Sequence, residues 1–226
     1  MDTNAYERPL ILAPVGGAEQ LKAALRTGAD AVYLGAKGFN ARRNAENFAE
    51  TSLEDAVAQC HERGVKVFVT LNTLVTDDEF AALTAELDDI AKAQADAVIV
   101  QDMGVMSLIR ARYPELPLYA STQTTVHNAE GAVLLDKLGF KQVVLARELS
   151  AKEIRAIQAA SPIQIECFVH GAHCMCMSGA CYLSAMLGGR SGNRGLCAQP
   201  CRLNFKLGKK ERALSLKDMC LIGHMD

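Results

Sequence analysis

The sequence predicts an α/β protein, and three observations point within that class to a (β/α) barrel. Short runs of β-branched and aliphatic residues recur along the chain, and amphipathic stretches of helical period separate them. The runs are too uniformly apolar for a sheet with one wet face, so they fit parallel strands covered on both sides. Polar residues follow the ends of successive runs, where a barrel collects its catalytic side chains.

The strands are predicted from these apolar runs in chain order. A doubly wound sheet is the other architecture that such β-then-α units allow. The first strand-to-helix turn, Pro14–Gly17, lacks the G-x-G-x-x-G fingerprint of a dinucleotide-binding sheet, which favours the barrel. The seven predicted strands are Leu10–Ala13, Ala31–Leu34, Lys66–Thr70, Ala97–Val100, Leu118–Ala120, Gln142–Leu145 and Gln164–Phe168.

Three of the intervening helices have readable signals. Thr76–Glu79 and Ser150–Glu153 both have the S/T-x-x-E form, in which a hydroxyl and a carboxylate satisfy the first amides of a helix. The helix that begins near Leu53 places four apolar residues on one face, at i, i+3, i+4 and i+7. Cys60 closes that stripe, so we expect it to be a small core residue.

Polar side chains suited to hydrogen bonding follow six of the predicted strands. In a barrel these positions share one rim, and their types suit a small polar or anionic molecule. For any single residue, the alternative is that polar side chains simply mark where a strand becomes a loop. We predict a cosubstrate site at Asn40, Arg42, Asn72, Gln101, Ser121 and Gln123, and catalytic residues at Arg147, His170 and Glu166.

The composition excludes several classes of protein. The chain has 226 residues, 50% of them apolar, with 24 basic against 26 acidic side chains. This excludes an extended disordered chain and a collagen-like fibre, and the net charge of -2 leaves any RNA contact to local basic clusters. The sequence shows neither a signal peptide nor a membrane span, so we expect a cytoplasmic protein with reduced thiols.

Six of the eight cysteines lie between Cys167 and Cys201. Four of them have the spacing C-x6-C-x15-C-x3-C, starting at Cys174 and continuing through Cys181, Cys197 and Cys201. Structural zinc sites use tighter knuckles, whereas iron–sulfur clusters accept more varied spacings. A disulfide framework and a reactive or buried thiol remain the alternatives. Positive charge lies nearby, on Arg190, Arg194 and Arg202. These side chains either bind phosphate or balance the negative charge of the thiolates.

Two long motifs carry a resemblance to a known family. The run Glu166–Ser184 (ECFVHGAHCMCMSGACYLS) and the element Asn193–Arg202 (NRGLCAQPCR) resemble the signatures of the collagenase-like peptidase family of unassigned catalytic type, U32. Within it the chain most resembles the branch that hydroxylates a cytidine of 23S ribosomal RNA. The supporting segments are Phe39–Arg42, Asn44, Ala45, Val67–Thr73, Val100–Gly104, Ala120–Gln123 and Leu145–Leu149.

The resemblance implies a fold, a cofactor and an activity. It implies a TIM-like (β/α) barrel, here incomplete with seven of eight strands, and a 4Fe-4S cluster on the four spaced cysteines, with Cys220 a rival of Cys201. It also implies RNA base hydroxylation, most simply 5-hydroxycytidine formation in 23S rRNA, with a prephenate-derived anionic cosubstrate. Ribosomal or transfer RNA is then the expected partner, and we expect no association with a membrane.

Other activities stay open at this point. The inherited peptidase label is one, although the sequence has neither H-E-x-x-H nor G-x-S-x-G. Transfer RNA uridine hydroxylation and a subunit role in an oxygen-independent hydroxylase complex are others. We predict a barrel core over 1–168, a cysteine-rich cluster-binding segment over 169–205, and the truncated start of a C-terminal extension over 206–226.

Overall fold

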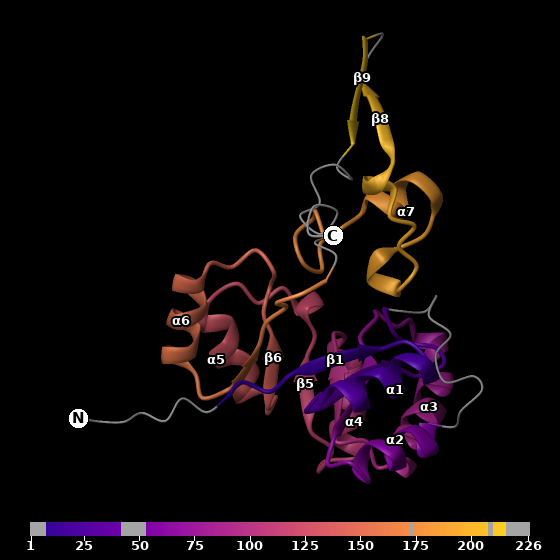
Figure 1. The fold of residues 1–226 in the computed structure, drawn as a ribbon, viewed down its shortest axis with the longest axis vertical. Helices are drawn as coiled ribbons and strands as arrows, with labels where there is room; N and C mark the ends of the chain where they lie inside the picture. The colour runs from indigo at the N-terminus through magenta and orange to yellow at the C-terminus, as the bar shows by residue number, and fades with distance from the viewer. Residues whose placement is uncertain (1–7, 42–52, 172–173, 208–209, 216–226) are drawn as a thin grey trace.

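The computed structural model describes residues 8–41, 53–171, 174–207 and 210–215. Seven parallel strands form one sheet in chain order, so each strand pairs with the one before it (Figure 1). A doubly wound sheet reverses its strand order and is therefore excluded. The strands are β1 (Leu12–Val15), β2 (Ala31–Gly35), β3 (Lys66–Leu71), β4 (Ala97–Val100), β5 (Leu118–Ala120), β6 (Gln142–Val144) and β7 (Gln164–Glu166).

Helices follow the strands and cover the outer face of the sheet, which makes the architecture a TIM-like half-barrel. In the described part of the chain, β7 does not pair with β1, so the sheet stays open there. The covering helices are α1 (Ala18–Thr27), α2 (Leu53–His61), α3 (Phe80–Lys92), α4 (Met103–Arg112), α5 (Ala129–Lys137) and α6 (Ala151–Ala160), with the short 3-10 helices η1 (Asp77–Glu79) and η2 (Thr122–Thr124).

The predicted strands are confirmed, with shifts of one or two residues at β1, β2, β3, β6 and β7. Both predicted capping boxes form: Glu79 accepts from the Thr76 backbone N–H at 2.9 Å, and Glu153 accepts from that of Ser150 at 2.7 Å. Cys60 is fully buried in the core. Local patterns sufficed for these features because each depends on residues only a few positions apart.

The two faces of the sheet bury different side chains. Facing the helices, the large core includes Val32, Val67 and Val98, all fully buried. The inner face holds a smaller cluster around Phe68 and Ile99, where Tyr119 meets Phe68 edge to face with ring centroids 4.9 Å apart. This inner cluster forms the apolar floor beneath the mouth of the half-barrel.

Two aspartates tie strand starts together at the opposite end of the sheet. Asp30 precedes β2 and accepts the backbone N–H of Ile11 at 2.7 Å, next to β1. Asp96 precedes β4 and accepts that of Val67 in β3, also at 2.7 Å. Each carboxylate satisfies a strand-end donor that a neighbouring strand does not reach.

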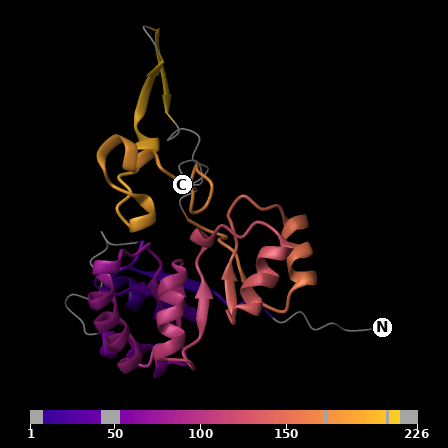
Figure 2. The ribbon, with the colours of Figure 1, turned by 180° about the vertical axis from the view of Figure 1, so that it is seen from behind.

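Beyond the other end of the sheet lies the cysteine-rich segment, residues 169–205 (Figures 1 and 2, orange to yellow). It contains α7 (Leu183–Gly188), η3 (Gly192–Arg194) and η4 (Pro200–Arg202), and runs into an antiparallel hairpin of β8 (Asn204–Leu207) and β9 (Lys210–Ser215). Among the described residues, no helix combines the length and apolarity needed to cross a membrane.

Candidate functional site

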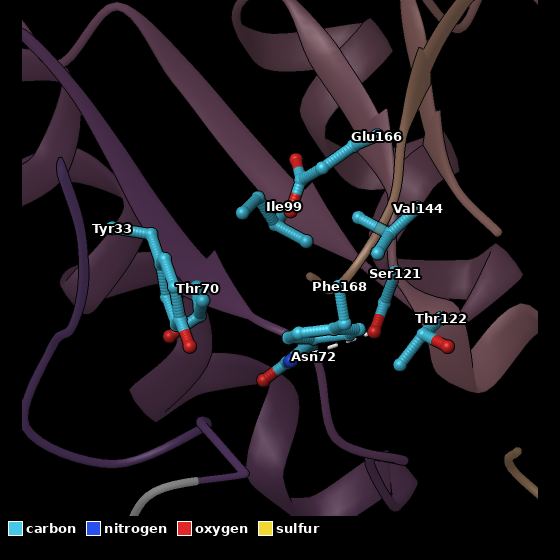
Figure 3. A pocket seen from close by; sticks show the side chains of 9 residues that line it. All are labelled: Tyr33, Thr70, Asn72, Ile99, Ser121, Thr122, Val144, Glu166 and Phe168. Atoms are coloured by element: carbon cyan, nitrogen blue, oxygen red, sulfur yellow. Dashed lines mark hydrogen bonds between the residues drawn. The ribbon is translucent and has the colours of Figure 1, made fainter. Parts of the chain in front are cut away.

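A small cavity of about 50 Å³ opens at the carboxyl ends of the strands, on the inner face of the half-barrel. Figure 3 shows Tyr33 and Thr70 on one side of it, Ser121 and Thr122 on the other, and the Phe168 ring between them. We call it the mouth pocket. Its lining residues come from β2 to β7 and the turns after them: Tyr33, Thr70, Asn72, Ile99, Ser121, Thr122, Val144, Glu166 and Phe168.

A chain of polar contacts fixes the wall of the mouth pocket. The Asn72 side chain accepts the backbone N–H of Ala41 at 2.9 Å, and its amide nitrogen lies 3.5 Å from the hydroxyl of Ser121. Ser121 is 2% exposed and caps η2 by accepting the N–H of Gln123 at 3.2 Å. These hydrogen bonds set the direction in which the amide and hydroxyl face the pocket.

Glu166 is the acid of the mouth pocket. Burial raises the pKa of its carboxyl to about 7, an effect that the hydrogen bond from Gln142 partly opposes. That bond runs from Gln142 Nε2 to Glu166 Oε2 and measures 2.6 Å. A carboxyl with this pKa exchanges its proton near neutral pH, as a general acid or base must.

The structure places three of the nine predicted site residues in the mouth pocket: Asn72, Ser121 and Glu166. Asn40 is fully buried and donates to the Ala36 carbonyl at 2.6 Å, beneath the rim. The side-chain oxygens of Gln101 and Gln123 are buried without a hydrogen-bond partner in the described part of the chain.

Neither Arg147 nor His170 lines the mouth pocket. Arg147 donates from Nε to the Ser178 hydroxyl at 3.1 Å, and His170 is exposed after β7. Arg42 lies outside the described residues. Sequence reasoning missed six of the nine lining residues: Tyr33, Thr70, Ile99, Thr122, Val144 and Phe168. The inward direction of Tyr33 and Thr70 follows from the alternation of side chains along β2 and β3, and that of Phe168 from the path of the chain after β7.

The cysteine-rich segment docks on the rim at two points, and the first is Ser178. Its backbone N–H donates to Glu148 Oε1 at 2.7 Å, and its carbonyl accepts the Thr125 hydroxyl at 2.8 Å. Ser178 is fully buried. Although burial opposes it, the backbone donors of Glu148 and Ser178 hold the pKa of the Glu148 carboxyl below its usual range, and His127 Nε2 lies 3.4 Å from that carboxyl.

The second docking point is the run from Asn193 to Gly195. The Asn193 carbonyl accepts the Leu74 N–H at 3.1 Å, and Arg194 donates to Glu79 at 2.6 Å. This hydrogen bond from Arg194, with those from Thr76, lowers the pKa of Glu79 to about 2. Arg194, one of the arginines predicted to serve phosphate or the thiolates, is therefore bound to the barrel.

A glycine makes each docking point possible. Gly179 has φ +74° and Gly195 has φ +73°, a region that side chains disfavour. A Cβ at Gly179 would collide with the Gln123 carbonyl, and one at Gly195 with the Asn40 carbonyl. The backbone of the segment thus lies directly against the backbone of the rim.

The described thiols of the segment share one neighbourhood. Burial raises the pKa of Cys201, and the thiols of Cys174, Cys197 and Cys181 raise it further. Cys176 is hydrogen-bonded to Cys181. All four predicted ligands thus lie within electrostatic range of one another, a soft sulfur donor set that suits iron or zinc.

The described thiols lie near one another but not at metal-binding distance. In the part of the chain that the structure describes, no three His, Cys, Asp or Glu side chains reach metal-binding distance. Cys167 is exposed at the end of β7, apart from the hydrogen-bonded pair. Cys220, the predicted rival of Cys201, lies outside the described residues.

Gly179→Ala should loosen the docked segment. We expect a loss of about 2 kcal/mol or more, because the new methyl group meets a backbone carbonyl that cannot move aside and the backbone is strained as well. Gly189→Ala is the matched control, since Gly189 has φ +67° with nothing within 4 Å. Urea unfolding together with proteolysis of the segment measures the difference, and equal losses in the two variants would contradict the close approach.

The raised pKa of Glu166 predicts a pH-dependent stability. Between its ordinary pKa of 4.5 and about 7 the folded state binds more protons than the unfolded state, so stability falls as pH rises through that window. Glu166→Gln should remove this fall and be more stable than the native chain at pH 8 by on the order of 2 kcal/mol. Glu62→Gln, at an exposed carboxylate, is the control; parallel curves for the native chain and Glu166→Gln would refute the shift.

Comparison with known proteins identifies several relatives of similar sequence. The chain is 43% identical over 224 residues to the 23S rRNA 5-hydroxycytidine C2501 synthase of Escherichia coli, covering 96% of this chain and 34% of that protein. It is 38% identical to a collagenase of Porphyromonas gingivalis (96% and 54% covered) and 35% identical to tRNA hydroxylation protein P1 of Bacillus subtilis (92% and 49%). The chain spans from about a third to about half of these relatives.

The fold has a solved counterpart. The structure of the U32 peptidase Mk0906 superimposes with a TM-score of 0.60 at 18% identity, covering 74% of this chain and 71% of that one. The model of peptidase family U32 matches residues 16–226. This match over most of the sequence shows that the chain belongs to peptidase family U32.

Proposed function

We propose that this protein takes part in RNA base hydroxylation, most specifically 5-hydroxycytidine formation in 23S rRNA, as an iron–sulfur enzyme. One observation carries the proposal: a thiol-rich segment is docked on the same rim that holds a polar pocket with an acid of pKa about 7. A cofactor site beside a proton-exchanging group is what oxidative chemistry on a base requires.

The relatives support RNA as the substrate. Two of the three named above are described as acting on RNA, one in ribosomal RNA and one in transfer RNA. The greater identity, 43% against 35%, favours ribosomal RNA. This chain covers only a part of each relative. The target nucleotide is therefore part of what we propose.

We assign the cluster to Cys174, Cys181, Cys197 and Cys201. A 4Fe-4S group held there supplies one-electron transfer or a Lewis-acidic iron. Docking through Ser178 and Gly195 holds this segment on the rim.

The remaining residues act through binding and proton transfer. Glu166 holds or releases a proton at its carboxyl, and Asn72 and Ser121 orient a polar ligand by hydrogen bonds. Arg147 provides positive charge on the rim for the anionic cosubstrate, with Arg42 and His170 as further contacts. Gln101 and Gln123 contribute buried acceptors without a partner among the described residues, so each suits a ligand N–H or O–H donor.

The peptidase alternative rests on the 38% identity to a collagenase. Nucleophilic proteolysis needs a base hydrogen-bonded to a hydroxyl or thiol. In the described part of the chain, His61 bonds Asp96 and His127 bonds the Thr125 carbonyl, and no histidine bonds a Ser, Thr or Cys side chain. The geometry therefore favours hydroxylation.

Deleting the gene should remove 5-hydroxycytidine from 23S rRNA of the host. Nucleoside mass spectrometry of purified rRNA measures the loss, and a plasmid copy of the gene should restore the modified base. Parallel digestion of transfer RNA tests the alternative substrate. Unchanged 5-hydroxycytidine in the deletion strain would overturn the assignment to ribosomal RNA.

Anaerobically purified protein should be brown and carry about four irons per chain. Cys181→Ser should lose most of the iron and the visible absorption, because it removes one ligand of the set. Cys167→Ser is the matched control and should keep both, since Cys167 is an exposed thiol outside the proposed ligands. A colourless native protein that cleaves collagen would instead support the peptidase.

A further inference from the structure

We propose that the mouth pocket binds a neutral pyrimidine base swung out of its RNA stack, and that Glu166 reads the hydrogen-bonding edge of that base. The inference rests on the proposed function and deepens it. It also assigns the anionic cosubstrate to a place outside the pocket, nearer Arg147.

The charge of the described lining of the pocket disfavours an anion as its occupant. None of the nine described lining residues is basic, and Glu166 is the carboxylic acid among them. An anion placed here would have no positive partner among the described lining residues and would face a carboxyl that ionises near neutral pH, so its burial would be costly. A neutral, polar ring carries no such penalty.

The size of the pocket suits one ring. Its 50 Å³ holds about four water molecules, since each needs roughly 10–15 Å³ of such space. About four waters occupy the space of a single six-membered ring with its substituents. A purine, with its second ring, needs more room than this.

The walls match the faces of a flat ring. Phe168 is 50% exposed at the entrance, and Ile99 and Val144 supply apolar surface further in (Figure 3). An aromatic side chain half-exposed beside a polar pocket is the arrangement on which unstacked bases stack in RNA-binding proteins. Thus Phe168 is placed to replace the stacking that a base loses when it leaves its strand.

Glu166 supplies the edge contact. Gln142 Nε2 donates to Oε2 at 2.6 Å, which keeps Oε2 an acceptor and leaves the proton of the neutral acid on Oε1. One donor and one acceptor side by side match N3 and N4 of cytosine, or O4 and N3 of uracil. Ionisation removes the donor and so weakens the binding of either pyrimidine.

The other titratable groups around Glu166 do not interfere near pH 7. Tyr119 on β5 has its pKa raised by burial, and so has Cys167, the next residue along the chain. Both shifts move these groups further from neutrality. Gln142 on β6 is uncharged, and Tyr33 contributes a phenol from β2.

Nucleoside binding to the full 226-residue chain tests the inference without turnover. Saturation-transfer NMR with cytidine, uridine, adenosine and prephenate, at pH 6 and pH 8, is the measurement. We expect cytidine and uridine to bind at pH 6 and adenosine to bind far more weakly. With an acid of pKa about 7, pyrimidine affinity should fall about tenfold by pH 8.

Three variants separate the edge contact from a general loss of structure. Glu166→Ala should weaken pyrimidine binding at least tenfold at pH 6, whereas Glu166→Gln keeps one donor and one acceptor and should bind equally at both pH values. Glu62→Gln, far from the pocket, should behave as the native chain. Thermal melting of each variant confirms that it folds, and Glu166→Gln reports on the contact even if Glu166→Ala does not fold.

Three results would overturn the inference: prephenate that displaces cytidine from the pocket, adenosine that binds as tightly as cytidine, or pyrimidine binding that Glu166→Ala leaves intact. These failures are distinct from failure of the proposed function. A deletion strain that lacks 5-hydroxycytidine, with a protein that binds no pyrimidine at this pocket, would leave the function standing and remove the base site.

Discussion

The close approach of two glycines to the rim of the half-barrel is the constraint on which the site depends. At Gly179 and Gly195 the cysteine-rich segment lies against carbonyls of the barrel, at distances that a single Cβ would prevent. Ser178 adds a buried hydroxyl and backbone group that Glu148 and Thr125 satisfy. Because the thiols lie on the segment between and beside these contacts, their position relative to the pocket follows from backbone packing.

This docking uses much of the charge on the rim. Arg147 and Glu148 contact Ser178, while Arg194 pairs with Glu79 at the other docking point. Each of these arginines, predicted from the sequence for other roles, forms a hydrogen bond that helps to hold the segment in place. The mouth pocket is left with hydroxyls, one amide and one acid, a set that recognises shape and hydrogen bonding more than charge.

Family U32 shows how little a shared fold says about chemistry. Relatives above 30% identity are described as a collagenase, an rRNA hydroxycytidine synthase and a tRNA hydroxylation protein. A barrel rim accepts many activities because the loops, and not the strands, carry the reacting groups. The choice among these activities has to come from the site. Here the site offers a docked thiol-rich segment, a proton-exchanging carboxyl in the mouth pocket, and histidines that bond no Ser, Thr or Cys side chain among the described residues.

The sequence by itself determined the strand series, the capping boxes, the buried stripe that ends at Cys60 and the family, because each of these is written in neighbouring residues or in long motifs. It also placed Asn72 and Ser121 on one rim and marked Glu166 as a catalytic residue. Only the tertiary structure decided which rim residues share a pocket: Tyr33, Thr70 and Phe168 enter it, whereas Asn40 and Arg147 serve the packing beneath and beside it. Burial of Glu166 was likewise a tertiary outcome, since the pKa of a carboxyl depends on what strands distant in the chain place around it.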